Sequence, residues 1–232
     1  MSDPLNPFIQ LMSFQSDLHW QSRWIQLLQD HTVSDAAHDL AHIQRVATNA
    51  RRLSEAEGAD WTVVMPAAWL HDCVIVPKSS PERKIASQLA ARQAVVWLAA
   101  DQWPEDRLDE IFHAIEAHSY SAGIAPTSLE ARVLQDADRL DALGAVGLAR
   151  TLMLGAEMKR VFYHFTDPFC ERREADDSIY TLDHVYSKLL KLESTMQTES
   201  GRREAAGRTK FLRDFLDQMR GELSFNSDAN DG

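Results

Sequence analysis

The sequence lacks the features of a membrane-spanning or exported protein. It has no apolar run long enough to cross a bilayer. Its first residues, M-S-D-P-L-N-P-F, contain no basic region followed by an apolar one, and so predict no secretory signal. Its two cysteines, Cys73 and Cys170, are in neither metal-type nor redox-type spacing, which favours reduced thiols over a disulfide. These absences predict a cytoplasmic protein without a membrane partner.

Basic residues are also scarce. The chain has 24 lysines and arginines against 35 aspartates and glutamates, which gives a formal net charge of −11. This balance argues against a protein that holds nucleic acid on a broad basic surface. It does not exclude a small phosphorylated ligand, because a local cluster of lysines and arginines can hold phosphate inside an acidic protein.

The sequence has no convincing strand pattern, no internal repeat and no low-complexity linker. Apolar residues instead recur at helical spacing along most of the chain. A length of 232 residues suits one domain with a substantial core. We therefore expect one all-α domain over residues 15–221, followed by a disordered tail over residues 222–232.

Glycine and proline positions set the expected helix boundaries. Gly58 follows one helix, whereas Pro81 and Pro104 stand at the start of others. The segment 156–180 has no sustained period, and we expect it to be either a lid over a pocket or a surface loop. The expected helices span residues 16–31, 36–57, 61–72, 81–101, 104–119, 128–155, 181–199 and 201–221, and the helix over 128–155 is expected to be partly interrupted.

Histidines and aspartates occur in short clusters. His38 and His42 are four residues apart in H-D-L-A-H-I-Q-R-V and share one helix face. Both can ligate one metal, one can support the other from behind, or both can be ordinary surface histidines. The adjacent pair His71 and Asp72 follows the apolar run V-V-M-P-A-A-W-L, where burying polar groups without a partner would be costly.

The run D-A-D-R-L-D places three carboxylates on an otherwise apolar helix. Asp138 and Asp141 lie near one face of this helix, while Asp136 points elsewhere. Crowded carboxylates repel one another unless a cation or arginines compensate them. A solvated acidic patch is the alternative, and the dense apolar residues on both sides argue against it.

Two imidazoles and two carboxylates from three segments form a set that can close on one divalent metal. Such a mixed set of nitrogen and oxygen ligands suits hydrolysis, because the bound cation acidifies water and neutralises charge on a phosphoryl oxygen. Mn²⁺ is our first choice, and Mg²⁺, Fe²⁺, Co²⁺ and Ni²⁺ stay open. His118, in E-A-H-S, is expected to contact phosphate or to shuttle a proton.

The order of these clusters resembles the HD-domain superfamily of metal-dependent phosphohydrolases, and more narrowly its YedJ/YpgQ-like subgroup. The family pattern is a histidine, then a His-Asp pair, then an aspartate. The matching stretches here are H-I-Q-R-V, W-L-H-D and D-A-D-R-L-D, and the similarity runs from about residue 15 to residue 221. A lone His-Asp pair would be weak evidence, but the ordered set is specific.

The resemblance implies an HD-type helical bundle with a C-terminal helical extension, and a metal held by His42, His71, Asp72 and Asp138. It also implies hydrolysis of a nucleotide or another small phosphoester, and nucleoside triphosphate pyrophosphohydrolysis is known in the subgroup. Some nucleotidase branches carry a glutamate three positions after the His-Asp pair. This chain has Ile75 there, so that acid/base role cannot be transferred.

The resemblance also guides the remaining roles. Lys84, Arg139 and Lys188 are expected to contact substrate phosphates, with Lys84 and Arg139 stabilising the transition state. Asp72 or Asp138, with His118 nearby, is expected to relay a proton. The rivals are a non-catalytic HD module that binds a nucleotide, and a cyclic nucleotide or cyclic dinucleotide phosphodiesterase, which would use a second metal. The exact substrate, the metal and the oligomeric state, a homodimer included, are left open by the sequence.

Overall fold

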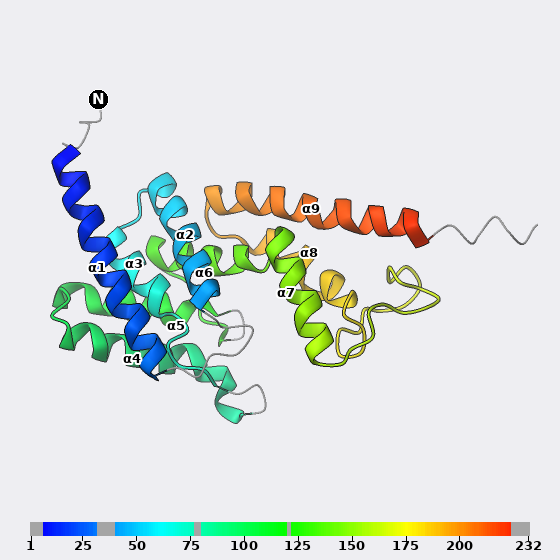
Figure 1. Ribbon diagram of the computed structural model, residues 1–232, viewed down its shortest axis with the longest axis horizontal. Coiled ribbons are helices and arrows are strands. Elements are labelled where there is room, and N and C mark those ends of the chain that lie inside the picture. Colours follow the sequence, from blue (N-terminus) through cyan, green and yellow to red (C-terminus); the bar gives the residue numbers. More distant parts are fainter. Residues whose placement is uncertain (1–6, 32–39, 77–79, 120–121, 224–232) are drawn as a thin grey trace, which may run out of the picture.

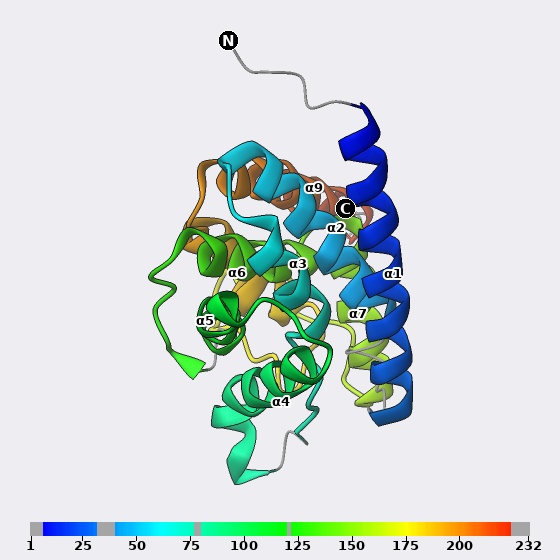
Figure 2. The same cartoon turned by 90° about the vertical axis from the view of Figure 1, so that its left-hand side faces the viewer.

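Helices make up the framework of the molecule (Figure 1, Figure 2). The computed structural model describes residues 7–31, 40–76, 80–119 and 122–223. In these ranges the only strand-type pairing is an isolated bridge between Val161 and Tyr180, so the all-α prediction is confirmed. No helix in the same ranges is long and apolar enough to cross a membrane.

The main helices are α1 (Pro7–His31), α2 (Leu40–Glu57), α3 (Trp61–Leu70), α4 (Ala86–Ala100), α5 (Leu108–His118), α6 (Leu129–Asp141), α7 (Gly144–Glu157), α8 (Leu190–Leu192) and α9 (Glu199–Leu223). Short turns of tighter or wider helix accompany them: η1 (Pro81–Ile85), η2 (Glu105–Arg107), η4 (Val185–Leu189) and η5 (Glu193–Thr195).

Local capping explains several boundaries. The carboxylate of Asp60 accepts a hydrogen bond from the backbone N–H of Thr62 (2.9 Å) and so begins α3. Gly58 has a φ of +76°, a conformation that glycine adopts without strain, and its N–H donates to the carbonyl of Ser54 (2.8 Å) at the end of α2. The predicted end of this helix before Gly58 is confirmed.

The interruption expected in the helix over 128–155 falls between α6 and α7, where Gly144 takes a φ of +69°. The helix expected over 181–199 forms in part. The turns η4, α8 and η5 follow one another directly from Val185 to Thr195, so this helical segment ends earlier than expected. Met196 leaves the helical region, and the backbone N–H groups of Gln197 and Thr198 donate to Asp136 instead of continuing a helix.

The core is built around α3. Every residue from Val63 to Leu70 is buried, and this helix packs against α2, α5 and α6. In both views α1 runs along one flank of the bundle, and α7 and α9 pack together farther along the chain (Figure 1, Figure 2). His71 and Asp72 follow α3 directly, so the chain carries them out of the most buried helix of the molecule.

The cysteines agree with the expectation of reduced thiols. Cys73 and Cys170 are both free in the structure. Cys73 is buried, and its Sγ donates to the carbonyl of Ala90 (3.3 Å). Burial raises the pKa of both thiols, which disfavours the reactive thiolate.

Asp136 anchors the start of α9. Its buried carboxylate accepts hydrogen bonds from the N–H of Gln197 (2.8 Å), and from both the N–H (2.8 Å) and the hydroxyl (2.7 Å) of Thr198. The Thr198 hydroxyl in turn accepts the N–H of Gly201 (3.0 Å), which caps the helix. A Cβ at position 201 would collide with Asp136, so glycine is required there.

Replacing Asp136 with asparagine should therefore destabilise the fold. We expect Asp136→Asn to lower the free energy of unfolding by about 2–3 kcal/mol, because a charged acceptor of several hydrogen bonds is lost. Urea denaturation measures this change. The control is Asp214→Asn on α9, where the carboxylate is 59% exposed and pairs with Lys210 at the surface, so its loss should leave stability nearly unchanged. Equal effects of the two variants would contradict this role for Asp136.

Candidate metal centre

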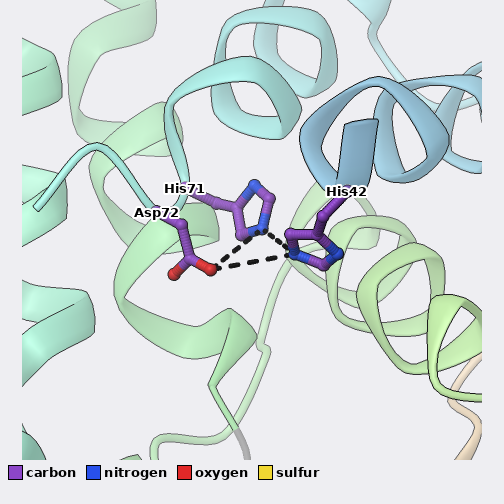
Figure 3. A group of neighbouring side chains, drawn as sticks. All are labelled: His42, His71 and Asp72. Atoms are coloured by element: carbon purple, nitrogen blue, oxygen red, sulfur yellow. Dashed lines mark hydrogen bonds and ion pairs between the residues drawn. The ribbon is translucent and has the colours of Figure 1, made fainter. Parts of the chain in front are cut away.

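Three ligand atoms converge where α3 ends (Figure 3). Nε2 of His42, Nε2 of His71 and a carboxylate oxygen of Asp72 all lie within 4.8 Å of one another. The two nitrogens are 3.3 Å apart, and Asp72 Oδ2 lies 3.8 Å from His42 and 3.7 Å from His71. Neighbouring residues inside a helix diverge by about 100°, but His71 and Asp72 stand just past Leu70, where the chain turns and both can face one point.

Asp138 joins this space from α6. Its Oδ1 lies 3.6 Å from Nε2 of His42. The side chains of Asp72 and Asp138 are 23% and 28% exposed, whereas both histidines are buried. The two imidazoles therefore form the buried side of the cluster, and the two carboxylates form an exposed edge that solvent reaches.

The hydrogen bonds fix which nitrogen of each histidine carries the proton. Nδ1 of His71 donates to the carbonyl of Ala68 (2.8 Å), and Nδ1 of His42 donates to the carboxylate of Asp141 (2.8 Å). Burial lowers the pKa of His71 to about 4, so this ring is neutral at neutral pH. In neutral rings of these tautomers both Nε2 atoms bear lone pairs that face each other. Two lone pairs beside two carboxylates are a donor set that fits a divalent cation.

Asp141 holds His42 from behind. Besides Nδ1 of His42, its carboxylate accepts Nε (2.6 Å) and Nη2 (3.1 Å) of Arg45, and a close contact from Arg150. Burial alone would raise the pKa of Asp141, but the hydrogen bonds from His42 and Arg45 keep it well below its usual range. Asp141 therefore stays ionised and fixes the tautomer and the orientation of His42.

His118 stands on the other side of Asp72. Its Nδ1 donates to the carbonyl of Ile115 (2.6 Å), and its Nε2 lies 3.6 Å from Asp72 Oδ1. The rings of His118 and His71 meet edge to face at 4.9 Å. Burial opposes protonation of His118, but the hydrogen bond and charge of Asp72 raise its pKa above the usual value. The two oxygens of Asp72 thus face different histidines.

The remaining predicted site residues lie apart from this cluster. Arg139 is buried, and its Nη1 donates to the carbonyl of Thr195 (2.5 Å), so in the structure it holds the segment before α9. Lys84 is exposed on η1, and no contact within the described residues links it to the cluster. Lys188 is exposed on η4 and lines a cavity of about 340 Å³. His38 lies outside the described residues.

Sequence reasoning missed one of the two arginines around Asp141, Arg150. Arg45 is three residues after His42 on α2, so helical spacing placed it near the same face. Arg150 belongs to α7, which begins after the change of helix direction at Gly144. No local sequence pattern indicates that Arg150 contacts Asp141. Only the arrangement of α6 and α7 brings it to Asp141.

Comparison with known proteins identifies the family. Residues 39–143, which contain His42, His71, Asp72 and Asp138, match the family model of the HD domain. The crystal structure of an HD-superfamily hydrolase from Bacillus thuringiensis is 32% identical in sequence, and the alignment covers 89% of this chain and 97% of that chain with a TM-score of 0.68. The chain belongs to the HD-domain superfamily. The resemblance drawn from the sequence is confirmed.

A second relative is YpgQ from Bacillus subtilis. YpgQ is 29% identical over 204 residues, which are 86% of this chain and 90% of YpgQ. Its crystal structure in complex with ADP aligns with a TM-score of 0.68 over 90% of this chain and 97% of that chain. The HD-type helical fold predicted here is thus shared with solved structures over nearly their whole length.

Removing the Asp141 carboxylate should weaken metal binding. We expect Asp141→Asn to reduce the affinity for Mn²⁺ about 10–100-fold, because His42 loses the acceptor that fixes its tautomer and strengthens it as a ligand. Isothermal titration calorimetry of metal-free protein with Mn²⁺ measures the change.

Asp101→Asn is the control for this measurement. Asp101 also carries an arginine partner, Arg23 at 3.0 Å, but it lies at the end of α4 rather than at the metal centre. The Mn²⁺ affinity of the Asp101→Asn variant should equal that of the unmodified protein. An unchanged affinity in Asp141→Asn would show that Asp141 does not support the metal ligand.

Proposed function

We propose that this chain is a divalent-metal-dependent phosphohydrolase that acts on a nucleotide or another small phosphoester. Its metal is held by His42, His71, Asp72 and Asp138. The observation that carries the proposal is the pair of buried imidazole Nε2 atoms, 3.3 Å apart, beside two carboxylates. Such a cluster is stable with a cation between its members and strained without one.

The chemistry follows from the donor set. A bound divalent cation lowers the pKa of water from about 15.7 towards about 7 and neutralises charge on a phosphoryl oxygen. His42 and His71 present fixed nitrogen atoms from the buried side. Asp72 and Asp138 line the exposed edge, from which substrate and water enter. Mn²⁺ is the first choice for this mixed set, and Mg²⁺, Fe²⁺, Co²⁺ and Ni²⁺ are alternatives.

His118 is the proposed proton carrier. Its raised pKa favours a proton on Nε2, which lies 3.6 Å from Asp72 Oδ1. Ile75 occupies the position that holds a glutamate in some related nucleotidases, so that position supplies no general acid or base. Asp72 orients the proton on His118 towards the exposed edge, where the leaving oxygen of the substrate must depart.

A nucleotide is the proposed substrate class. The ADP complex of YpgQ supports it, since that relative shares the fold over nearly the whole chain. Within this class, nucleoside triphosphates with release of pyrophosphate are the first reaction to test. Lys188 is the best supported of the predicted phosphate contacts because it lines a cavity together with Arg45. Lys84 and Arg139 are weaker candidates, because Lys84 is exposed on η1 and Arg139 donates to the carbonyl of Thr195.

A phosphodiesterase is the second candidate. The observation in its favour is that Asp72 presents one oxygen to His42 and His71 and the other to His118. A carboxylate in this position can bridge two metals, as the two-metal chemistry of phosphodiester hydrolysis requires. Binding of two Mn²⁺ ions per chain together with hydrolysis of cyclic nucleotides or dinucleotides would favour this candidate.

A substrate screen tests the proposal. The protein is stripped with a chelator, reloaded with Mn²⁺ and assayed against nucleoside mono-, di- and triphosphates and phosphodiesters. We expect hydrolysis that requires the metal and falls about 100-fold or more in Asp72→Ala, because a ligand and a proton acceptor are both lost. Asp101→Ala should retain full activity.

Three results would count against it. Hydrolysis that survives removal of the metal would exclude the metal centre as the catalyst. Full activity in Asp72→Ala would exclude the assigned ligand. Nucleotide binding without hydrolysis under every metal tested would identify a non-catalytic binding module instead.

A further inference from the structure

A cationic cavity lies beside the metal centre. It has a volume of about 340 Å³ and is bounded by α7, by η4 and by Arg45 of α2. Its charged and imidazole side chains are Arg45, Arg150, Arg160, His184 and Lys188. Among the described residues no aspartate or glutamate lines it, although acidic residues outnumber basic ones by 35 to 24 in the whole chain. Behind the lining, Asp141 pairs with Arg45 and Arg150, and Asp177 pairs with His184. A concentration of positive charge in so acidic a protein indicates an anionic ligand.

Two of these cations, Arg160 and Lys188, form no ion pair within 4.0 Å in the described ranges of the chain. The charge of Asp177 acts on Arg160 from beyond that distance. The Nε of Arg160 is buried and has no hydrogen-bond acceptor among the described residues. A buried guanidinium N–H without an acceptor is destabilising, and such groups in folded proteins usually mark a missing ligand or water.

The other two arginines connect the cavity to the metal centre. Arg45 and Arg150 both donate to Asp141, and Asp141 accepts Nδ1 of His42. The same guanidinium groups therefore border the cavity and support a proposed metal ligand. A ligand in the cavity would be linked to the candidate metal centre through these arginines, Asp141 and His42.

We propose that this cavity binds a phosphate group, with Arg160 and Lys188, which form no close ion pair, as its main contacts. A tetrahedral dianion presents several oxygens, which suits the planar fork of a guanidinium and the point charge of an ammonium. The volume lies in the range of small-molecule sites and exceeds the needs of one phosphate, so a phosphate that carries a further substituent also fits.

The same cationic side chains would bind a phosphate group from either of two sources. One is the terminal phosphate of a nucleotide, and the other is free inorganic phosphate. The first source rests on the proposed function, whereas the second does not. Binding to metal-free protein is measured without turnover, so a failure of the cavity and a failure of the hydrolase activity are separate results.

Calorimetric titration of inorganic phosphate into the metal-free protein tests the cavity. We expect saturable binding that becomes at least tenfold weaker in Arg160→Gln and in Lys188→Gln. The control is Arg172→Gln, which changes an exposed arginine of the same connecting segment that does not line the cavity. Circular dichroism confirms that each variant retains its helices, and two separate cavity variants keep the test valid if one fails to fold.

Competition with ADP identifies the source. If a nucleotide places its terminal phosphate in the cavity, ADP displaces inorganic phosphate, and its own binding weakens in Arg160→Gln. If the cavity takes a free anion, ADP and phosphate bind together. Either result supports a phosphate site. The proposal is overturned if phosphate does not bind saturably, if both cavity variants bind it as tightly as the unmodified protein, or if Arg172→Gln weakens binding equally.

Discussion

The hydrogen bond between Nδ1 of His42 and the carboxylate of Asp141 is the contact on which the metal centre depends. It joins α2 to α6, and it directs the lone pair of His42 towards His71. Asp141 is buried, so its charge is tolerable only because Arg45 and Arg150 surround it. The fold and the chemistry of the centre are linked through this one carboxylate.

The run D-A-D-R-L-D illustrates how one short stretch of helix can serve three purposes. Because successive residues rotate by about 100°, Asp138 and Asp141 leave α6 near one face while Asp136 points elsewhere. Asp136 anchors the start of α9, Asp138 lies beside Nε2 of His42, and Asp141 accepts a hydrogen bond from Nδ1 of His42. Apolar neighbours surround this stretch, so a buried carboxylate needs hydrogen bonds or opposite charge nearby. Asp136 accepts backbone N–H groups, Asp141 is paired with arginines, and Asp138 is partly exposed.

Sequence reasoning predicted what periodicity and local chemistry control. The helices around the core and the different direction of Asp136 followed from helical geometry. It failed where distant contacts decide. The helix expected over 181–199 ends at Thr195, because the next backbone N–H groups donate to Asp136, and Arg150 reaches Asp141 only through the packing of α7. Neither contact leaves a trace in the local pattern.

The position of a bound metal tests the central claim most directly. A crystal of the protein grown with Mn²⁺ and measured for anomalous scattering locates the ion without any assumption about activity. The account predicts one strong anomalous peak within ligand distance of His42, His71, Asp72 and Asp138, with Asp141 still bonded to His42. A peak at another place, or none at all with Mn²⁺ present, would contradict it.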